Sequence, residues 1–148
     1  PMEAVADWVT NNRLRAHAWL TVDDLVYLKR GGRVSATSAI FGSMLDIKPI
    51  LTLTKAGKLE AVGKVQGRKK ALRTIVDRVA ENIEKPEEQE VIILHGDAEE
   101  DALLLKDMLT ARIPELAGAR PHMIGAVIGS HCGPGTLSCC FMGRERPV

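Results

Sequence analysis

EVIILHGDAEEDALLLKDMLTAR, residues 90–112, contains two elements of different period in direct succession. The first part, 90–95, has four consecutive apolar residues, which predicts a strand buried on both faces. A further apolar run, from about Pro121 to Gly129, is predicted to be another strand. Between them, 98–112 carries apolar residues at helical spacing, at Leu103, Leu104, Met108 and Leu109. The order strand, helix, strand indicates a βαβ unit and therefore an α/β protein of mixed α+β character.

The sequence on either side of this segment predicts the remaining elements. We expect helices over 3–15, from Asp23 to the pair Gly31-Gly32, from Ser35 to Leu45 and over 68–85; we expect strands over 16–20, 47–53, 59–65 and 136–142. Pro49 has no N–H and predicts a break or a sheet edge within its strand. Together these elements predict a layered domain with a roughly six-stranded mixed sheet flanked by four or five helices.

The composition is that of an ordinary globular domain. A length of 148 residues suits one domain, and 45% apolar with 26% charged residues excludes a disordered chain, a fibre and a coiled coil. Twenty Lys and Arg against nineteen Asp and Glu give a net charge of +1. Overall charge therefore favours neither nucleic acid nor a membrane surface as the partner.

Cysteine usage and hydropathy indicate a cellular compartment. The three cysteines are odd in number and clustered, which does not suit a disulfide framework and favours a reducing, cytoplasmic location. The stretch 121–143 has no Asp, Glu, Lys or Arg, but Gly133-Pro134-Gly135 interrupts it, so we expect no stable membrane insertion. We expect neither a metal nor a cofactor, because no metal-site spacing is found among His122, His131, Cys132, Cys139 and Cys140.

The densest chemical signal is the segment 124–135, in which an apolar run leads into Ser130, His131 and a Gly-Pro-Gly turn. If the run is a strand, Ser130 and His131 lie at a strand end, where side chains and backbone N–H groups can face a ligand. The alternative is a tight turn whose glycines only supply positive φ. A Ser/His hydrolase is a further alternative, although the segment lacks the G-x-S-x-G register of a nucleophile elbow.

A second signal is the pair Gly31-Gly32 between Arg30 and Arg33 at a predicted helix end. Guanidinium and backbone donors there can hold a carboxylate or a phosphate. The same residues also suit a plain glycine cap with two solvated arginines. The order of residues matches neither a phosphate-binding loop nor a dinucleotide fold, so nucleotide binding is disfavoured.

The charges of the central region are segregated along the chain. Residues 64–78 contain six basic side chains and one acidic one, whereas 81–101 contain nine acidic side chains and one lysine. Such a basic block is typical of a solvated helix face, and otherwise of a surface for an acidic partner or for nucleic acid. A nucleic-acid-binding module therefore stays an alternative, which the low aromatic content of 3% weakens.

Four ordered motifs resemble the DegV family, the bacterial fatty-acid-binding proteins of the FakB type that serve a fatty acid kinase. The motifs are DLVYLKRGGRVS at 24–35, LDIKPI at 45–50, GKVQGRKKAL at 63–72 and GAVIGSHCGPG at 125–135. The resemblance covers only the C-terminal half of such a protein. It implies that 1–148 is a DegV-like C-terminal domain and that the family's N-terminal α/β domain is a separate partner.

The resemblance also implies a function and a set of site residues. A long-chain fatty acid would place its acyl chain inside this domain and its carboxylate at the domain junction, near Arg33 and His131. Gly32, Ser130, Gly133 and Gly135 would form the surrounding loops. The protein would present the carboxylate for phosphorylation in phospholipid metabolism without being an enzyme itself, and the kinase would dock on Lys64, Arg68, Lys69 and Lys70.

Overall fold

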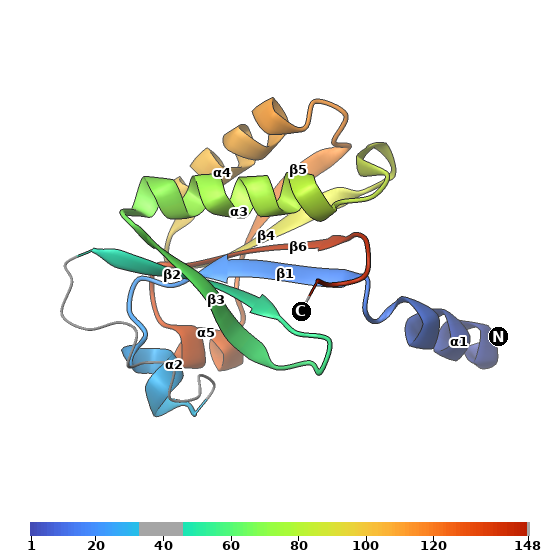
Figure 1. Cartoon of the computed structure of the whole chain (residues 1–148), viewed down its shortest axis with the longest axis horizontal. Coiled ribbons are helices and arrows are strands. Elements are labelled where there is room, and N and C mark those ends of the chain that lie inside the picture. Colours follow the sequence, from blue (N-terminus) through green and yellow to red (C-terminus); the bar gives the residue numbers. More distant parts are fainter. Residues whose placement is uncertain (33–45, 148) are drawn as a thin grey trace.

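The computed structural model describes residues 1–32 and 46–147. Figure 1 shows one twisted sheet with helices on both of its faces. The strands are β1 (Ala16–Thr21), β2 (Ile47–Leu53), β3 (Leu59–Gln66), β4 (Glu90–Gly96), β5 (Gly118–Met123) and β6 (Thr136–Met142). The helices are α1 (Met2–Asn12), α2 (Val26–Arg30), α3 (Arg68–Asn82), α4 (Glu99–Arg112) and α5 (Ala126–Cys132), with a short 3₁₀ turn, η2, at Pro86–Glu88. The predicted mixed six-stranded layered fold is confirmed.

The sheet has the strand order β3-β2-β1-β6-β4-β5. β1 and β6 pair antiparallel at its centre, from Ala16 opposite Met142 to Thr21 opposite Leu137. On one side the hairpin β2–β3 extends the sheet, and on the other β4 and β5 pair in parallel through the crossover helix α4. The strands predicted over 47–53 and 59–65 therefore form a hairpin, and the predicted βαβ unit is present.

The main core lies between the sheet and the helices α3 and α4. α3 buries a stripe at helical spacing, as predicted for 68–85, although the helix ends at Asn82. The central strand β6 presents alternate residues to these helices, which is the period expected of a strand. The core residues from these two elements are Ala71, Leu72, Ile75, Val76, Val79, Leu137, Cys139 and Phe141.

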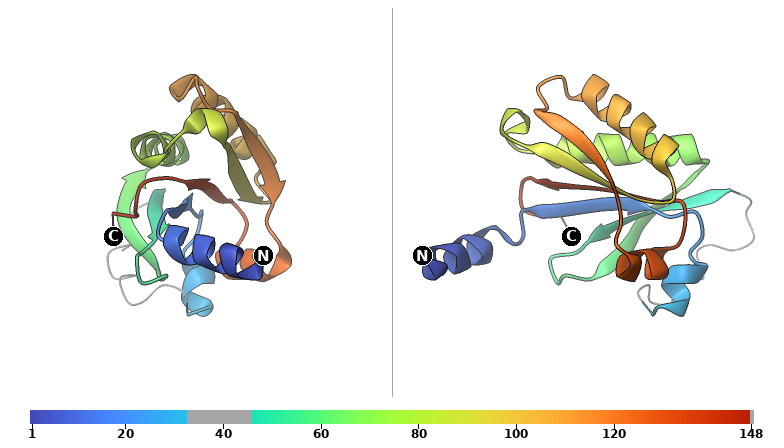
Figure 2. Two further views of the ribbon diagram at one scale, coloured as in Figure 1. Left: turned by 90° about the vertical axis from the view of Figure 1, so that its right-hand side faces the viewer. Right: turned by 180° about the vertical axis from the view of Figure 1, so that it is seen from behind.

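We use the term second face for the sheet surface opposite α3 and α4. The helices α2 and α5 lie over one end of this face, as the rear view in Figure 2 shows. A smaller core forms there, with Leu20, Val22, Leu28, Leu51 and Cys132 buried. Farther along the face Ile92 keeps 45% of its surface exposed. The prediction that the strand of 90–95 is buried on both faces is therefore wrong, because only Val91, Ile93 and His95 of these residues are buried.

The apolar run of 121–129 is not one strand. β5 ends at Met123, Gly125 is extended, and a seven-residue helix begins at Ala126. A short apolar run without alternation fits a strand and a buried helical segment equally well, and here it divides between the two. Ser130 and His131 consequently lie near the C-terminal end of a helix and not at a strand end.

Pro49 does not break its strand. β2 runs through Pro49, which pairs with Lys64 of β3, while the pairing of β2 with β1 is through Leu51 and Thr52. At Pro49 the strand is therefore paired on one side only, as an edge strand is, and the missing N–H of proline is tolerated there. The helix predicted from Ser35 to Leu45 lies outside the described residues.

His17 is buried near the end of β1 that is remote from α2 and α5. Its ring stacks on Phe141 with 4.9 Å between centroids, and its Nε2 lies 2.7 Å from the carbonyl oxygen of Arg144. Burial lowers the pKa of His17 below 6.5; the carbonyl of Arg144 opposes this shift and the cation of Arg146 adds to it. The fold therefore holds His17 in its neutral form.

We predict that His17 makes stability fall in mild acid. Because the pKa of His17 is lowered on folding, its contribution is complete above about pH 6.5, the unfolded value, and is lost as the pH falls toward the folded value. Urea unfolding between pH 8 and 5 should show this loss. In His17→Phe, which keeps a ring against Phe141, the loss should be smaller, whereas an unchanged pH profile would contradict the prediction.

Candidate functional site

α2 and α5 meet at one end of the second face. His131, in the last turn of α5, lies against Gly31, which follows the last residue of α2. A β-carbon at Gly31 would come within 2.5 Å of His131 Nδ1, so only glycine permits this approach. The two segments that the sequence analysis selected are thus neighbours in space, although Arg33 itself lies outside the described residues.

The turn Gly133–Gly135 is held by close backbone approaches. Gly133 and Gly135 have φ angles of 80° and 76°, which favour glycine. A β-carbon at Gly133 would lie 2.4 Å from the Tyr27 ring, and one at Gly135 would lie 2.2 Å from an Asp23 carboxylate oxygen. The positive φ angles and the lack of space for a β-carbon both require glycine at these positions. The turn packs against the loop and the helix that follow β1.

Tyr27 and Asp23 were not among the residues selected from the sequence. The two glycines indicated a close approach but not the partner, because Asp23 is more than a hundred positions away in the chain. The turn is fixed further by Thr136, whose Oγ1 donates to the Gly133 carbonyl at 2.8 Å, and by the Gly135 N–H, which donates to the Gly96 carbonyl at 2.7 Å. His131 therefore lies beside a rigid turn.

The geometry does not favour Ser130 as a nucleophile. Ser130 is exposed and its Oγ donates to the Val127 carbonyl at 2.8 Å, within its own helix. Burial raises the pKa of the neighbouring Cys132 thiol, so thiolate chemistry is also disfavoured. These contacts do not support the hydrolase alternative.

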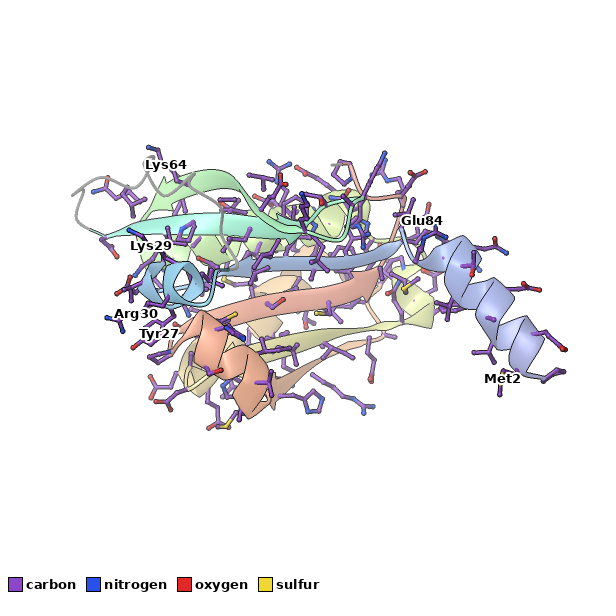
Figure 3. All side chains as sticks on the ribbon, turned by 90° about the horizontal axis from the view of Figure 1, so that it is seen from below. Met2, Tyr27, Lys29, Arg30, Lys64 and Glu84 are labelled. Carbon is purple, nitrogen blue, oxygen red and sulfur yellow. The ribbon has the colours of Figure 1, made fainter. Side chains whose placement is uncertain are left out.

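The second face offers apolar surface beside α5, the helix that contains His131. Ala18 pairs with Cys140, and Cys140 also pairs with Ile92, so the three side chains form a row across β1, β6 and β4. Leu20, Ser138 and Leu94 form the adjacent row, nearer to α5. Figure 3 views this face from below and shows α2 and α5 over one end, with α1 projecting beyond the other. In the described part of the chain, no helix lies over the strands between these two ends.

Pro134 and Gly135 of the Gly133–Gly135 turn also line a hollow of about 710 Å³. Its carboxylates would repel an anion, so it is not suited to the carboxylate of a fatty acid. The acidic residues that line this hollow are Asp23, Asp24, Asp97, Glu99, Glu100 and Asp101. The apolar second face and the acidic hollow are therefore chemically distinct surfaces that share one turn.

The cations of the basic block 64–78 differ in exposure and in ion pairing. Arg68 is 19% exposed, and its Nε donates to Asp101 Oδ2 at 2.8 Å. Lys64, on β3, and Lys69 and Lys70, in the first turn of α3, have exposed side chains. Lys64 lies at the same end of the molecule as Lys29 and Arg30 of α2, as Figure 3 shows. A continuous basic stripe of the kind that tracks a nucleic-acid backbone is therefore not formed by the whole block.

Comparisons with known proteins agree with this architecture. The family described as "Uncharacterised protein, DegV family" matches residues 1–144. A DegV domain-containing protein of Clostridium perfringens is 41% identical over 145 residues, which are 98% of this chain and 50% of that protein. The chain thus spans about half the length of the curated relatives it matches.

Solved structures share the fold. The fatty acid binding DegV family protein SAG1342 of Streptococcus agalactiae superimposes with a TM-score of 0.83 at 28% identity, covering 97% of this chain and 50% of that one. The Streptococcus pneumoniae Fatty Acid Kinase B3 protein, loaded with linoleic acid, gives a TM-score of 0.78 over 96% of this chain and 50% of that one; at 17% identity the likeness concerns the fold alone.

The mixed sheet with helices on both faces and the glycine turn beside His131 define an α/β domain of the kind found in these structures. The chain belongs to the DegV family.

We predict that Gly31→Ala displaces the His131 ring. Gly31 has a φ of −75°, which alanine adopts without strain, so the only new effect is the clash with His131 Nδ1. The His131 ring signals in a ¹H–¹³C NMR spectrum should move, and stability should fall by about 1–3 kcal/mol.

Gly32→Ala is the matched control for this substitution. Gly32 has a φ of 66° but open space at its β-carbon position, so alanine there strains the backbone without touching His131. Stability should fall by about 1–2 kcal/mol while the His131 signals stay in place. Equal displacement of His131 in both variants would refute the steric contact.

Proposed function

We propose that the protein binds a long-chain fatty acid, with the acyl chain along the second face and the carboxylate at the end where α2 and α5 meet. The observation that carries this proposal is an apolar sheet surface that ends at α2 and α5, the two helices at whose ends Gly31 and His131 meet. Solved DegV family structures described as fatty acid binding proteins support the ligand class. The protein would then present the carboxylate to a partner fatty acid kinase without supplying catalytic groups.

The dimensions and the chemistry of the second face suit an acyl chain. The seven residues of β6 span about 23 Å. The acyl chains of one bilayer leaflet fill a layer about 15 Å thick, so the face is long enough for an acyl chain. The rows of Ala18, Cys140 and Ile92 and of Leu20, Ser138 and Leu94 have no charged side chain. Burial of 14–16 methylenes contributes roughly 11–13 kcal/mol before ordering costs are subtracted.

The carboxylate requires compensation, because an unpaired buried anion costs several kcal/mol. His131 supplies an imidazole at this end of the face. We propose that Arg33, two residues after Gly31 in the sequence, supplies a guanidinium, and that Gly32, Ser130, Gly133 and Gly135 belong to the surrounding loops. In this proposal the site is completed at the junction with the N-terminal α/β domain that the family resemblance implies.

The exposed cations of α3 support a docking role. Helix N-termini favour anions, yet the first turn of α3 contains Arg68, Lys69 and Lys70 and no acidic residue. Asp101 offsets the charge of Arg68, whereas Lys69 and Lys70 oppose the helix dipole from exposed positions. Residues that oppose local stability are expected where function retains them. We propose that Lys64, Lys69 and Lys70 contact an acidic surface of the kinase.

The first prediction from this proposal is that oleate protects Cys140 from modification. Cys132 and Cys139 are buried, while Cys140 is partly exposed on the second face. A small methanethiosulfonate reagent should therefore modify Cys140 in the ligand-free protein, and oleate should slow this reaction at least tenfold. Mass spectrometry of the modified protein measures the rate, and organic extraction of the natively expressed protein should release a long-chain fatty acid.

His131→Ala should weaken the protection of Cys140 about tenfold, because a hydrogen bond to a charged group contributes about 1.5–3 kcal/mol. Cys140→Ser is the control for reagent specificity. If no fatty acid is extracted and oleate leaves the modification rate unchanged, the proposal fails.

The second prediction is that Lys69→Glu and Lys70→Glu affect stability and docking in opposite directions. An acidic residue in the first turn of α3 should raise the free energy of unfolding by about 0.3–1 kcal/mol at low salt. The same change should reduce kinase-dependent formation of acyl phosphate, because it repels an acidic partner surface.

Lys106→Glu, an equal charge change on the exposed side of α4, is the control. It should leave phosphorylation unchanged. Undiminished phosphorylation in the α3 variants, with oleate bound, would exclude this face as the docking surface.

A further inference from the structure

Arg68 differs from the lysines beside it because its guanidinium bridges separate elements. Its Nε donates to Asp101 Oδ2 of α4 at 2.8 Å, and its Nη1 lies 3.4 Å from Asp23 Oδ1 in the loop after β1. Its Nη2 is buried and has no hydrogen-bond partner among the described residues. A partly buried arginine held in this way is unsuited to contact an external protein surface.

Asp23 connects this ion-pair network to the turn beside His131. Lys48 of β2, 13% exposed, contacts the same Asp23 oxygen at 2.9 Å. A β-carbon at Gly135 would lie 2.2 Å from the other oxygen, Oδ2, so the peptide backbone of the turn packs directly on the carboxylate. The position of the Asp23 side chain therefore limits where the turn that follows His131 can lie.

We propose that Arg68 is a positioning residue for the carboxylate end of the site and acts on His131 through Asp23 and the Gly133–Gly135 turn. This inference rests on the proposed function and deepens it, since it removes Arg68 from the docking surface. The guanidinium fixes Asp23 relative to α4, Asp23 fixes Gly135, and the turn fixes the C-terminal end of α5 that carries His131.

The planar guanidinium is the part of this arrangement that a lysine cannot reproduce. It directs N–H groups at two carboxylates from fixed angles, whereas an ammonium is a point charge on a flexible stem. Arg68→Lys keeps the charge but loses the defined geometry. Arg68→Gln removes the charge, and Asp23→Asn removes the partner charge while its shape against Gly135 is kept.

The test uses the ligand-free protein first. In ¹H–¹³C NMR spectra, Arg68→Gln and Asp23→Asn should both shift or broaden the His131 ring signals, and Arg68→Lys should do so to a smaller extent. Lys69→Gln, which removes a neighbouring exposed cation, is the matched control and should leave the His131 signals in place. Unchanged His131 signals in Arg68→Gln with a lowered melting temperature would mean that Arg68 only stabilises the fold, and the proposal would be overturned.

The second arm measures oleate affinity by calorimetric titration at a temperature where all variants are folded. Arg68→Gln should weaken binding at least fivefold, Lys69→Gln should bind as the unaltered protein does, and the double variant with Asp23→Asn should be no weaker than Arg68→Gln alone. Full affinity in Arg68→Gln would contradict the positioning role. If the unaltered protein does not bind oleate, the proposed function fails, whereas the His131 spectra still decide whether Arg68 positions that ring.

Discussion

The antiparallel pairing of β1 with β6 is the constraint on which the rest of the structure depends. These strands lie near opposite ends of the described chain, and their six residue pairs join the β2–β3 hairpin to the β4–α4–β5 unit. Without this pairing the sheet separates into two pieces, and neither the core under α3 and α4 nor the second face is continuous. Because the pairing closes a very long loop, its entropic cost is offset only when both halves pack together.

The same pairing creates the candidate site. In an antiparallel pair, the end of one strand lies beside the start of the other, so the residues after β1 meet the residues before β6. The first group contains Asp23 and α2, and the second contains α5 and the Gly133–Gly135 turn. The approach of Gly31 to His131 and of Asp23 to Gly135 follows from this geometry. The arrangement of the candidate site is thus a result of strand order and not of a local motif.

Elements with a clear period could be predicted from the sequence, whereas contacts between distant elements could not. The amphipathic stripe of α3 identified this helix from local residues. The apolar run of 121–129, which forms the end of β5 and the start of α5, has no clear period. Where the strand ends and the helix begins depends on the packing of α5 against α2. Gly31 and His131 were both selected from the sequence, but the contact between them was not predicted. The ion pairs of Arg68 could not be predicted either, because its partners Asp23 and Asp101 come from other elements.

One consequence concerns α1. Its residues are almost all solvent-exposed, with Trp8 and Val9 each more than half exposed, and Figure 1 shows the helix projecting away from the sheet. An isolated helix of 11 residues is marginal in water, because few hydrogen bonds repay its nucleation. The backbone amides of α1 should therefore exchange with solvent much faster than those of α3, as a separate unit of local unfolding. We therefore expect that a surface which covers Trp8 would order α1 without altering the packing of the core, and that α1 would unfold separately from the sheet.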